Sequence, residues 1–158
     1  MDSELIARIA ERLRFSKQWL ATAESCTGGM IAQLLTSIAG SSEWFERGLV
    51  TYSNRAKMEL LGVPASVIDR HGAVSEECAI AMAAGLLRKA PVQWALSVTG
   101  IAGPGGGTED KPVGTVWIGL AHADRAEARH ALFKGDREGI RRQSAGAALA
   151  MLDARLQG

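Results

Sequence analysis

The sequence predicts an α/β fold, a three-layer α/β/α sandwich around a mixed, mostly parallel sheet of about five strands. Apolar runs of strand length alternate with segments whose apolar residues recur at the helical period, and this alternation requires crossovers between parallel strands. Near the end of the chain, two segments of strand type follow each other across a short turn, which adds an antiparallel pair.

The first half of the chain is expected to alternate helix and strand. Ser3 can cap an amphipathic helix, and residues 19–23 have the composition of a strand. Thr27-Gly28-Gly29 then leads into a helix over residues 30–38, which places Ser25 at a strand-to-helix turn.

A second strand and helix are expected to place Lys57. The strand covers residues 47–52, and Ser53 and Asn54 can cap a short helix that carries Lys57. Gly62 and Pro64 stop this helix. Lys57 is therefore expected near a helix start, which is an unfavourable place for a cation.

The second half is expected to hold two helices and three strands. Ser75 caps a helix to Leu87, and an apolar strand follows at residues 94–99. Residues 100–112 are rich in glycine and proline and form a loop. Residues 114–121 and 125–133 pair as a hairpin, and Asp136 caps the final helix.

The composition is that of one globular domain over residues 1–158. Hydrophobic residues make up 47% and charged residues 22%, which argues against disorder. The net charge of +1 predicts no nucleic-acid partner. Without an apolar run of the ~20 residues that span a bilayer, or a signal-like start, we expect no membrane contact and a cytoplasmic location. The composition is compatible with a homo-oligomer.

Ser25 is the first candidate nucleophile. It would lie at the opening of a helix, where free N–H groups of Cys26, Thr27, Gly28 and Gly29 favour the negative charge of an oxyanion. The alternative is structural: Ser25 or Thr27 caps the helix and the glycines form a tight turn.

Cys26 is the rival nucleophile, because a thiol at a helix start can have a lowered pKa. Free cysteines are more often small buried hydrophobes, and no histidine is near in sequence. The two cysteines and three histidines lack the spacing of a metal site, so neither a metal nor another cofactor is expected.

Lys57 is the candidate base. If it is buried, its pKa falls and it can take a proton from a serine hydroxyl, as Ser-Lys hydrolases require. Tyr52, just before this helix, could donate a hydrogen bond in the same site. The alternatives are a solvated surface lysine and a tyrosine that packs at the strand end.

Two segments could hold an anion such as a phosphate. Gly100-Ile101-Ala102-Gly103 follows a strand, as ligand loops of α/β sheets do, although it matches neither the P-loop nor the G-x-G-x-x-G pattern. Arg137 or Arg141, at the start of the last helix, could bind the same group. The alternatives are a flexible connection and two solvated arginines.

Five segments, in the same order, resemble the CinA C-terminal domain family, and the resemblance covers nearly the whole chain. They are Thr22-Ala23-Glu24-Ser25-Cys26-Thr27-Gly28-Gly29, Gly48-Leu49-Val50-Thr51-Tyr52-Ser53-Asn54, His71-Gly72-Ala73-Val74-Ser75, Thr99-Gly100-Ile101-Ala102-Gly103-Pro104 and Lys111-Pro112-Val113-Gly114-Thr115-Val116.

The resemblance implies hydrolysis of nicotinamide mononucleotide to nicotinic acid mononucleotide and ammonia, in the recycling of pyridine nucleotides. It implies a Ser-Lys dyad, carried over onto Ser25 and Lys57, and substrate contacts by Tyr52, Thr99, Gly100 and Arg141. The partner it implies is a small nucleotide substrate. A non-catalytic nucleotide-binding module and a competence- or damage-associated regulatory domain are the alternatives.

Overall fold

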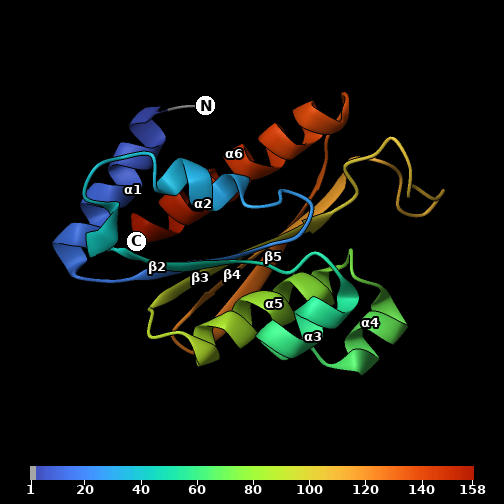
Figure 1. Cartoon of the computed structure of the whole chain (residues 1–158), viewed down its shortest axis with the longest axis horizontal. Coiled ribbons are helices and arrows are strands. Elements are labelled where there is room, and N and C mark those ends of the chain that lie inside the picture. The colour runs from blue at the N-terminus through green and yellow to red at the C-terminus, as the bar shows by residue number, and fades with distance from the viewer. Residues whose placement is uncertain (1–2) are drawn as a thin grey trace.

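The computed structural model describes residues 3–158, so the first two residues of the expected domain lie outside the described residues. Its elements follow the predicted alternation (Figure 1). They are α1 Ser3–Ser16, β1 Leu20–Glu24, α2 Met30–Leu35, the 3-10 helix η1 Ser41–Glu43, β2 Phe45–Val50, α3 Asn54–Leu61, α4 Ala65–His71, α5 Glu76–Lys89, β3 Trp94–Gly100, β4 Thr115–His122, β5 Arg125–Leu132 and α6 Arg137–Leu156.

The five strands form one mixed sheet in the order β2-β1-β3-β4-β5. β1 pairs in parallel with both β2 and β3, whereas β4 pairs antiparallel with β3 and with β5. The predicted fold class and the late hairpin are therefore confirmed.

Helices cover both faces of the sheet, with α1, α2 and α6 on one side and α3, α4 and α5 on the other (Figure 1). The face toward α1 and α6 carries large apolar residues such as Leu96 and Ile118. The face toward α5 carries small ones, and a Cβ on Gly119 would lie only 2.4 Å from the Ala79 carbonyl oxygen. Small side chains thus let α5 pack close to the strands.

Three helix starts have the caps that the sequence predicts. The Ser53 side chain accepts from the Ala56 N–H, Ser75 from Cys78, and Asp136 from Gly139. Each side chain replaces a partner that the first turn of a helix lacks.

Several elements differ from the expectation. β2 covers Phe45–Val50 rather than residues 47–52, and the short helix η1 was not predicted. α2 ends at Leu35 rather than at residue 38, because Thr36 already leaves the helical conformation. α4 was not predicted: Pro64, which the sequence assigns only as a stop, is also the N-cap of this helix. Proline at a helix start costs no hydrogen bond, so one residue can end α3 and begin α4.

Four connections meet at one edge of the sheet. β1, β2 and β3 run parallel, so the segments that follow Glu24, Val50 and Gly100 leave the sheet on the same side. β5 has the same direction because two antiparallel steps separate it from β3, and α6 therefore begins at this edge. The segment between β3 and β4, gold in Figure 1, projects past the sheet.

None of the helices formed by residues 3–158 is both long and apolar enough to cross a membrane.

Candidate active site

Ser25 directly follows β1 at this edge. Its backbone N–H donates to the Val98 carbonyl of β3 at 3.0 Å, which continues the strand pairing by one residue and holds the serine in place. The residue is only 8% exposed. Its hydroxyl therefore faces the interior of the edge instead of bulk solvent.

Lys57 reaches Ser25 from the other side of the turn. Its Nζ lies 2.9 Å from Ser25 Oγ, 2.9 Å from the Thr51 carbonyl oxygen and 3.2 Å from the Tyr52 carbonyl oxygen. The residue is 1% exposed although it lies in the second turn of the short helix α3. The solvated-lysine alternative is excluded for this structure.

The charge of Lys57 has no acidic partner. Among residues 3–158, no carboxylate lies within ion-pair distance of its Nζ. Burial lowers the pKa of Lys57 below its ordinary value, because the ammonium form loses its hydration without gaining a counter-charge. The shift is toward the neutral amine, which is the form that can accept a proton.

The start of α2 differs from the expected anion site, because the side chain of Glu24 already occupies it. Glu24 is buried, and its carboxylate accepts from the N–H groups of Ile31 at 2.9 Å and Ala32 at 3.0 Å and from the Thr27 hydroxyl at 2.6 Å. Neither Ser25 nor Thr27 caps α2, whose N-cap is Gly29.

Sequence reasoning missed the role of Glu24. Its signal was weak, since an acidic residue six positions before a helix does not match the usual N-cap spacing. The long side chain reaches the helix only because residues 25–29 form a turn that folds back over it.

Three backbone donors remain in the turn after Ser25. The Gly28 N–H donates to the Ser25 carbonyl, but the N–H groups of Cys26, Thr27 and Gly29 have no acceptor on another residue within the described part of the chain. Arg141 of α6 donates from Nε to the Cys26 carbonyl at 3.1 Å and from Nη2 to the Thr27 carbonyl at 3.0 Å. Because a trans peptide points its N–H away from its carbonyl, the contact with the Cys26 carbonyl sets the direction of the Thr27 N–H, and the contact with the Thr27 carbonyl sets that of the Gly28 N–H.

Cys26 is a poor nucleophile here. Burial raises the pKa of its thiol to about 11, so the reactive thiolate is scarce at neutral pH. Its sulfur packs against β3, where a Cβ on Gly100 would lie 3.1 Å away. The thiol therefore fills the space that Gly100 leaves.

The glycine-containing segment offers fewer free N–H groups than expected. The Ile101 N–H donates to the Thr115 carbonyl, and Gly103 presents its carbonyl oxygen to Arg137 at 2.6 Å. Ala102 is buried in the core, and the Thr99 hydroxyl donates to the Ala73 carbonyl at 2.9 Å. Thr99 thus ties β3 to the segment before α5.

Tyr52 and Asn54 lie on the connection from β2 to α3. The Tyr52 carbonyl contacts the dyad, while its ring is 60% exposed and its hydroxyl accepts from Arg137 Nη2 at 3.1 Å. Asn54 is an exposed first residue of α3. The structure therefore brings Ser25, Lys57, Tyr52, Arg137 and Arg141 together at one edge, and leaves Asn54 at its margin.

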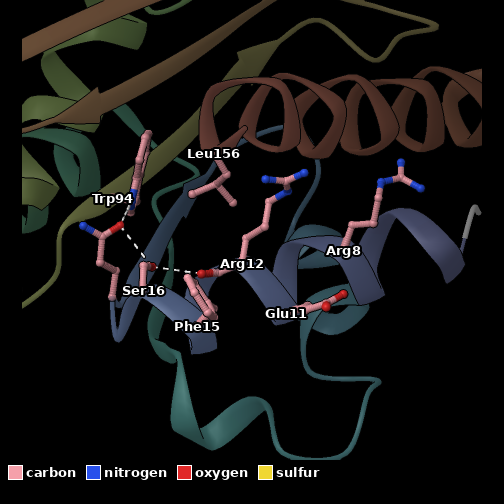
Figure 2. A pocket seen from close by; sticks show the side chains of 8 residues that line it. Arg8, Glu11, Arg12, Phe15, Ser16, Trp94 and Leu156 are labelled. Atoms are coloured by element: carbon pink, nitrogen blue, oxygen red, sulfur yellow. Dashed lines mark hydrogen bonds between the residues drawn. The ribbon is translucent and has the colours of Figure 1, made fainter. Parts of the chain in front are cut away.

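A groove at the opposite edge of the sheet is lined by Phe15, Trp94 and Leu156 together with charged residues of α1 (Figure 2). Trp94 begins β3, whereas Ser25 contacts its other end. The hydroxyl of Ser16, which also lines the groove, donates to the Arg12 carbonyl at the end of α1. This groove therefore offers packing surface but no nucleophile paired with a base.

No group of three His, Cys, Asp or Glu side chains within residues 3–158 could hold a metal ion. The expectation of a cofactor-free site stays a prediction.

Comparison with known proteins places the chain in a family. The model of the CinA C-terminal domain matches residues 2–156. The nicotinamide-nucleotide amidohydrolase PncC of Escherichia coli (strain K12) is 49% identical over 156 residues, which cover 96% of this chain and 94% of that protein. A CinA-like protein of Anaeromyxobacter dehalogenans is 48% identical over 149 residues, although the matched part is only 36% of its length.

Comparison with solved structures supports the same family. The competence/damage inducible protein CihA of Agrobacterium tumefaciens has a TM-score of 0.95 at 41% identity, covering 99% of this chain and 95% of that one. The competence damage-inducible protein A of Klebsiella pneumoniae has a TM-score of 0.94 at 38% identity, covering 98% and 96%. The chain belongs to the CinA C-terminal domain family.

Proposed function

We propose that this chain hydrolyses the carboxamide of nicotinamide mononucleotide to nicotinic acid mononucleotide and ammonia, as a cytoplasmic step in the recycling of pyridine nucleotides. The substrate is suggested by the similarity to the nicotinamide-nucleotide amidohydrolase PncC of E. coli. The chemistry is suggested by one observation, the 2.9 Å contact between a buried lysine without a counter-charge and the Ser25 hydroxyl.

The surroundings of Lys57 suit a neutral base. A neutral amine has two N–H donors and one lone pair, and the carbonyls of Thr51 and Tyr52 accept the two donors. The lone pair is then directed to Ser25, whose hydroxyl proton it can accept. The same three contacts that bury the lysine therefore aim its lone pair at the nucleophile.

In the proposed reaction, Ser25 Oγ attacks the carboxamide carbon and its proton passes to Lys57 Nζ. The free N–H groups of Cys26 and Thr27 stabilise the oxyanion that forms. Lys57 then returns the proton to the leaving nitrogen. Ammonia departs, and the acyl group remains bound to Ser25 as an ester. A water molecule, deprotonated by Lys57, hydrolyses the ester and restores the serine.

The test is ammonia release from nicotinamide mononucleotide by the purified chain, with chelator present. We expect Ser25→Ala and Lys57→Met to lose at least about 1,000-fold in kcat, in line with losses seen when a nucleophile or base is removed. Cys26→Ala is the matched control and should stay within a few-fold, because its thiol is protonated.

Activity lost in Cys26→Ala but kept in Ser25→Ala would reverse the assignment of the nucleophile. If the unsubstituted chain binds the nucleotide without turnover, it is a binding module instead. If it neither binds nor hydrolyses the nucleotide, the result fits a regulatory domain.

A further inference from the structure

Arg137 is an arginine beside the dyad without an acidic partner. Its guanidinium donates from Nη1 to the Gly103 carbonyl at 2.6 Å and from Nη2 to the Tyr52 hydroxyl at 3.1 Å, and both acceptors are neutral. No carboxylate among residues 3–158 forms an ion pair with it. Arg141 and Arg142, on the same helix, both pair with Glu138.

The structure separates the roles of the two arginines that the sequence could not distinguish. All three nitrogens of the Arg141 guanidinium are engaged, by the carbonyls of Cys26 and Thr27 and by Glu138. Arg137 is exposed and uses two of the five N–H groups that a guanidinium carries. Of the two, only Arg137 therefore combines free donors with a charge that no carboxylate among the described residues pairs.

Tyr52 links this cation to the dyad. The backbone carbonyl oxygen of Tyr52 lies 3.2 Å from Lys57 Nζ and 3.5 Å from Ser25 Oγ. The hydroxyl at the end of the Tyr52 side chain contacts Arg137. The guanidinium is thus linked to the reacting atoms through one tyrosine residue. In a pyridine mononucleotide, a ring and a ribose separate the carboxamide from the phosphate, so a cation that binds the phosphate also has to lie beside the dyad and not on it.

We propose that Arg137, held by Tyr52 and Gly103, binds the 5′-phosphate of the substrate and makes the site selective for nucleotides over nucleosides. This inference rests on the proposed function. A phosphate dianion pairs well with the planar fork of a guanidinium, and it can also accept a hydrogen bond from the Tyr52 hydroxyl. Arg137 is a specificity-determining residue in this account and takes no part in the chemical step.

The first experiment compares kcat/KM for nicotinamide mononucleotide and for nicotinamide riboside, which lacks the phosphate. We expect Arg137→Met to lose about 10- to 100-fold with the nucleotide, as for the loss of charge-assisted hydrogen bonds, and to be unchanged with the riboside. Arg142→Met, an exposed arginine one turn further along α6, is the matched control and should keep the natural preference.

Equal losses with both substrates would overturn the proposal, since Arg137 would then only support the segment around Gly103. Unchanged kinetics with both would overturn it as well, because the phosphate would be bound elsewhere.

The second experiment measures binding without turnover, in the Ser25→Ala background, by calorimetry with the same two compounds. Tighter binding of the nucleotide than of the riboside, abolished by adding Arg137→Met, supports the proposal even if the natural chain releases no ammonia. In that case the proposed function would be wrong, while the phosphate site would still be supported. Equal affinity for the two compounds in Ser25→Ala would overturn the phosphate site.

Discussion

At the scale of single residues, the site depends on an unfavourable burial. Lys57 has hydrogen-bond partners for its Nζ but no counter-charge among the described residues, and its pKa is lowered by the loss of hydration. Such a residue costs stability when it is charged. The cost is consistent with function, because lysines with lowered pKa values act as bases near neutral pH.

The pH dependence of activity should report this lysine. Only neutral Lys57 can accept the serine proton, so kcat/KM is expected to rise about tenfold per pH unit below the pKa of Lys57 and to level off at a pH below 10.5, the ordinary lysine value. Ammonia release across a pH series measures this.

The control for the pH series is Lys57→Arg, which stays charged at every accessible pH and should be inactive throughout. If the activity of the unsubstituted chain does not change with pH below the pKa of Lys57, the role of Lys57 as the base is contradicted.

The contribution of Lys57 to the free energy of unfolding, like the activity, should increase with pH. Because the pKa of Lys57 is lower in the folded state than in the unfolded state, the unfolded chain binds more protons between the two values. The free energy of unfolding contributed by this group therefore rises with pH from the folded pKa up to about 10.5, the unfolded value.

At the scale of elements, the turn between β1 and α2 is built around Glu24. The carboxylate binds two N–H groups of α2 and the Thr27 hydroxyl, so the strand that leads to Ser25 also supplies the acceptor for the start of the next helix. The helix start is thereby neutralised by the protein itself. The negative charge of an oxyanion must then be stabilised by the turn, not by the helix.

Removal of this carboxylate should destabilise the chain more than removal of an ordinary cap. Glu24→Ala leaves two buried donors and one partly buried donor without this acceptor, and we expect a loss of roughly 2–5 kcal/mol in the free energy of unfolding. Ser75→Ala at α5 is the comparison and should lose about 1 kcal/mol. Urea denaturation measures both, and losses of equal size would show that Glu24 acts only as a cap.

At the scale of the whole molecule, the last helix completes a site whose proposed nucleophile directly follows the first strand. Arg141 contacts residues 26 and 27 across the fold, and Arg137 contacts Tyr52 and Gly103. Every one of these contacts joins segments that leave the same edge of the sheet. The sheet order thus assembles the site, and α6 closes it.

Arg141→Met should therefore act differently from Arg137→Met. Loss of the contact with the Cys26 carbonyl loosens the Thr27 N–H, one of the two donors proposed for the oxyanion, and we expect kcat to fall about 10- to 100-fold with little change in KM. Steady-state kinetics with nicotinamide mononucleotide measure the split. A raised KM with unchanged kcat would show that Arg141 binds substrate instead.

The sequence by itself determined what depends on neighbours along the chain. Helical periods, strand runs and the caps at Ser53, Ser75 and Asp136 are local patterns, and they determined the fold class and placed Ser25 and Lys57 next to helix starts. α4 was missed because a proline stop and a proline start look alike in sequence.

Only the tertiary structure decided which distant groups meet. It placed Lys57 Nζ 2.9 Å from Ser25 Oγ and buried the Cys26 thiol against Gly100. It also paired Arg141 with Glu138 and left Arg137 with neutral acceptors only. These outcomes follow from the order of strands in the sheet and from the burial of each group. Both depend on contacts between segments far apart in the sequence, which no local pattern records.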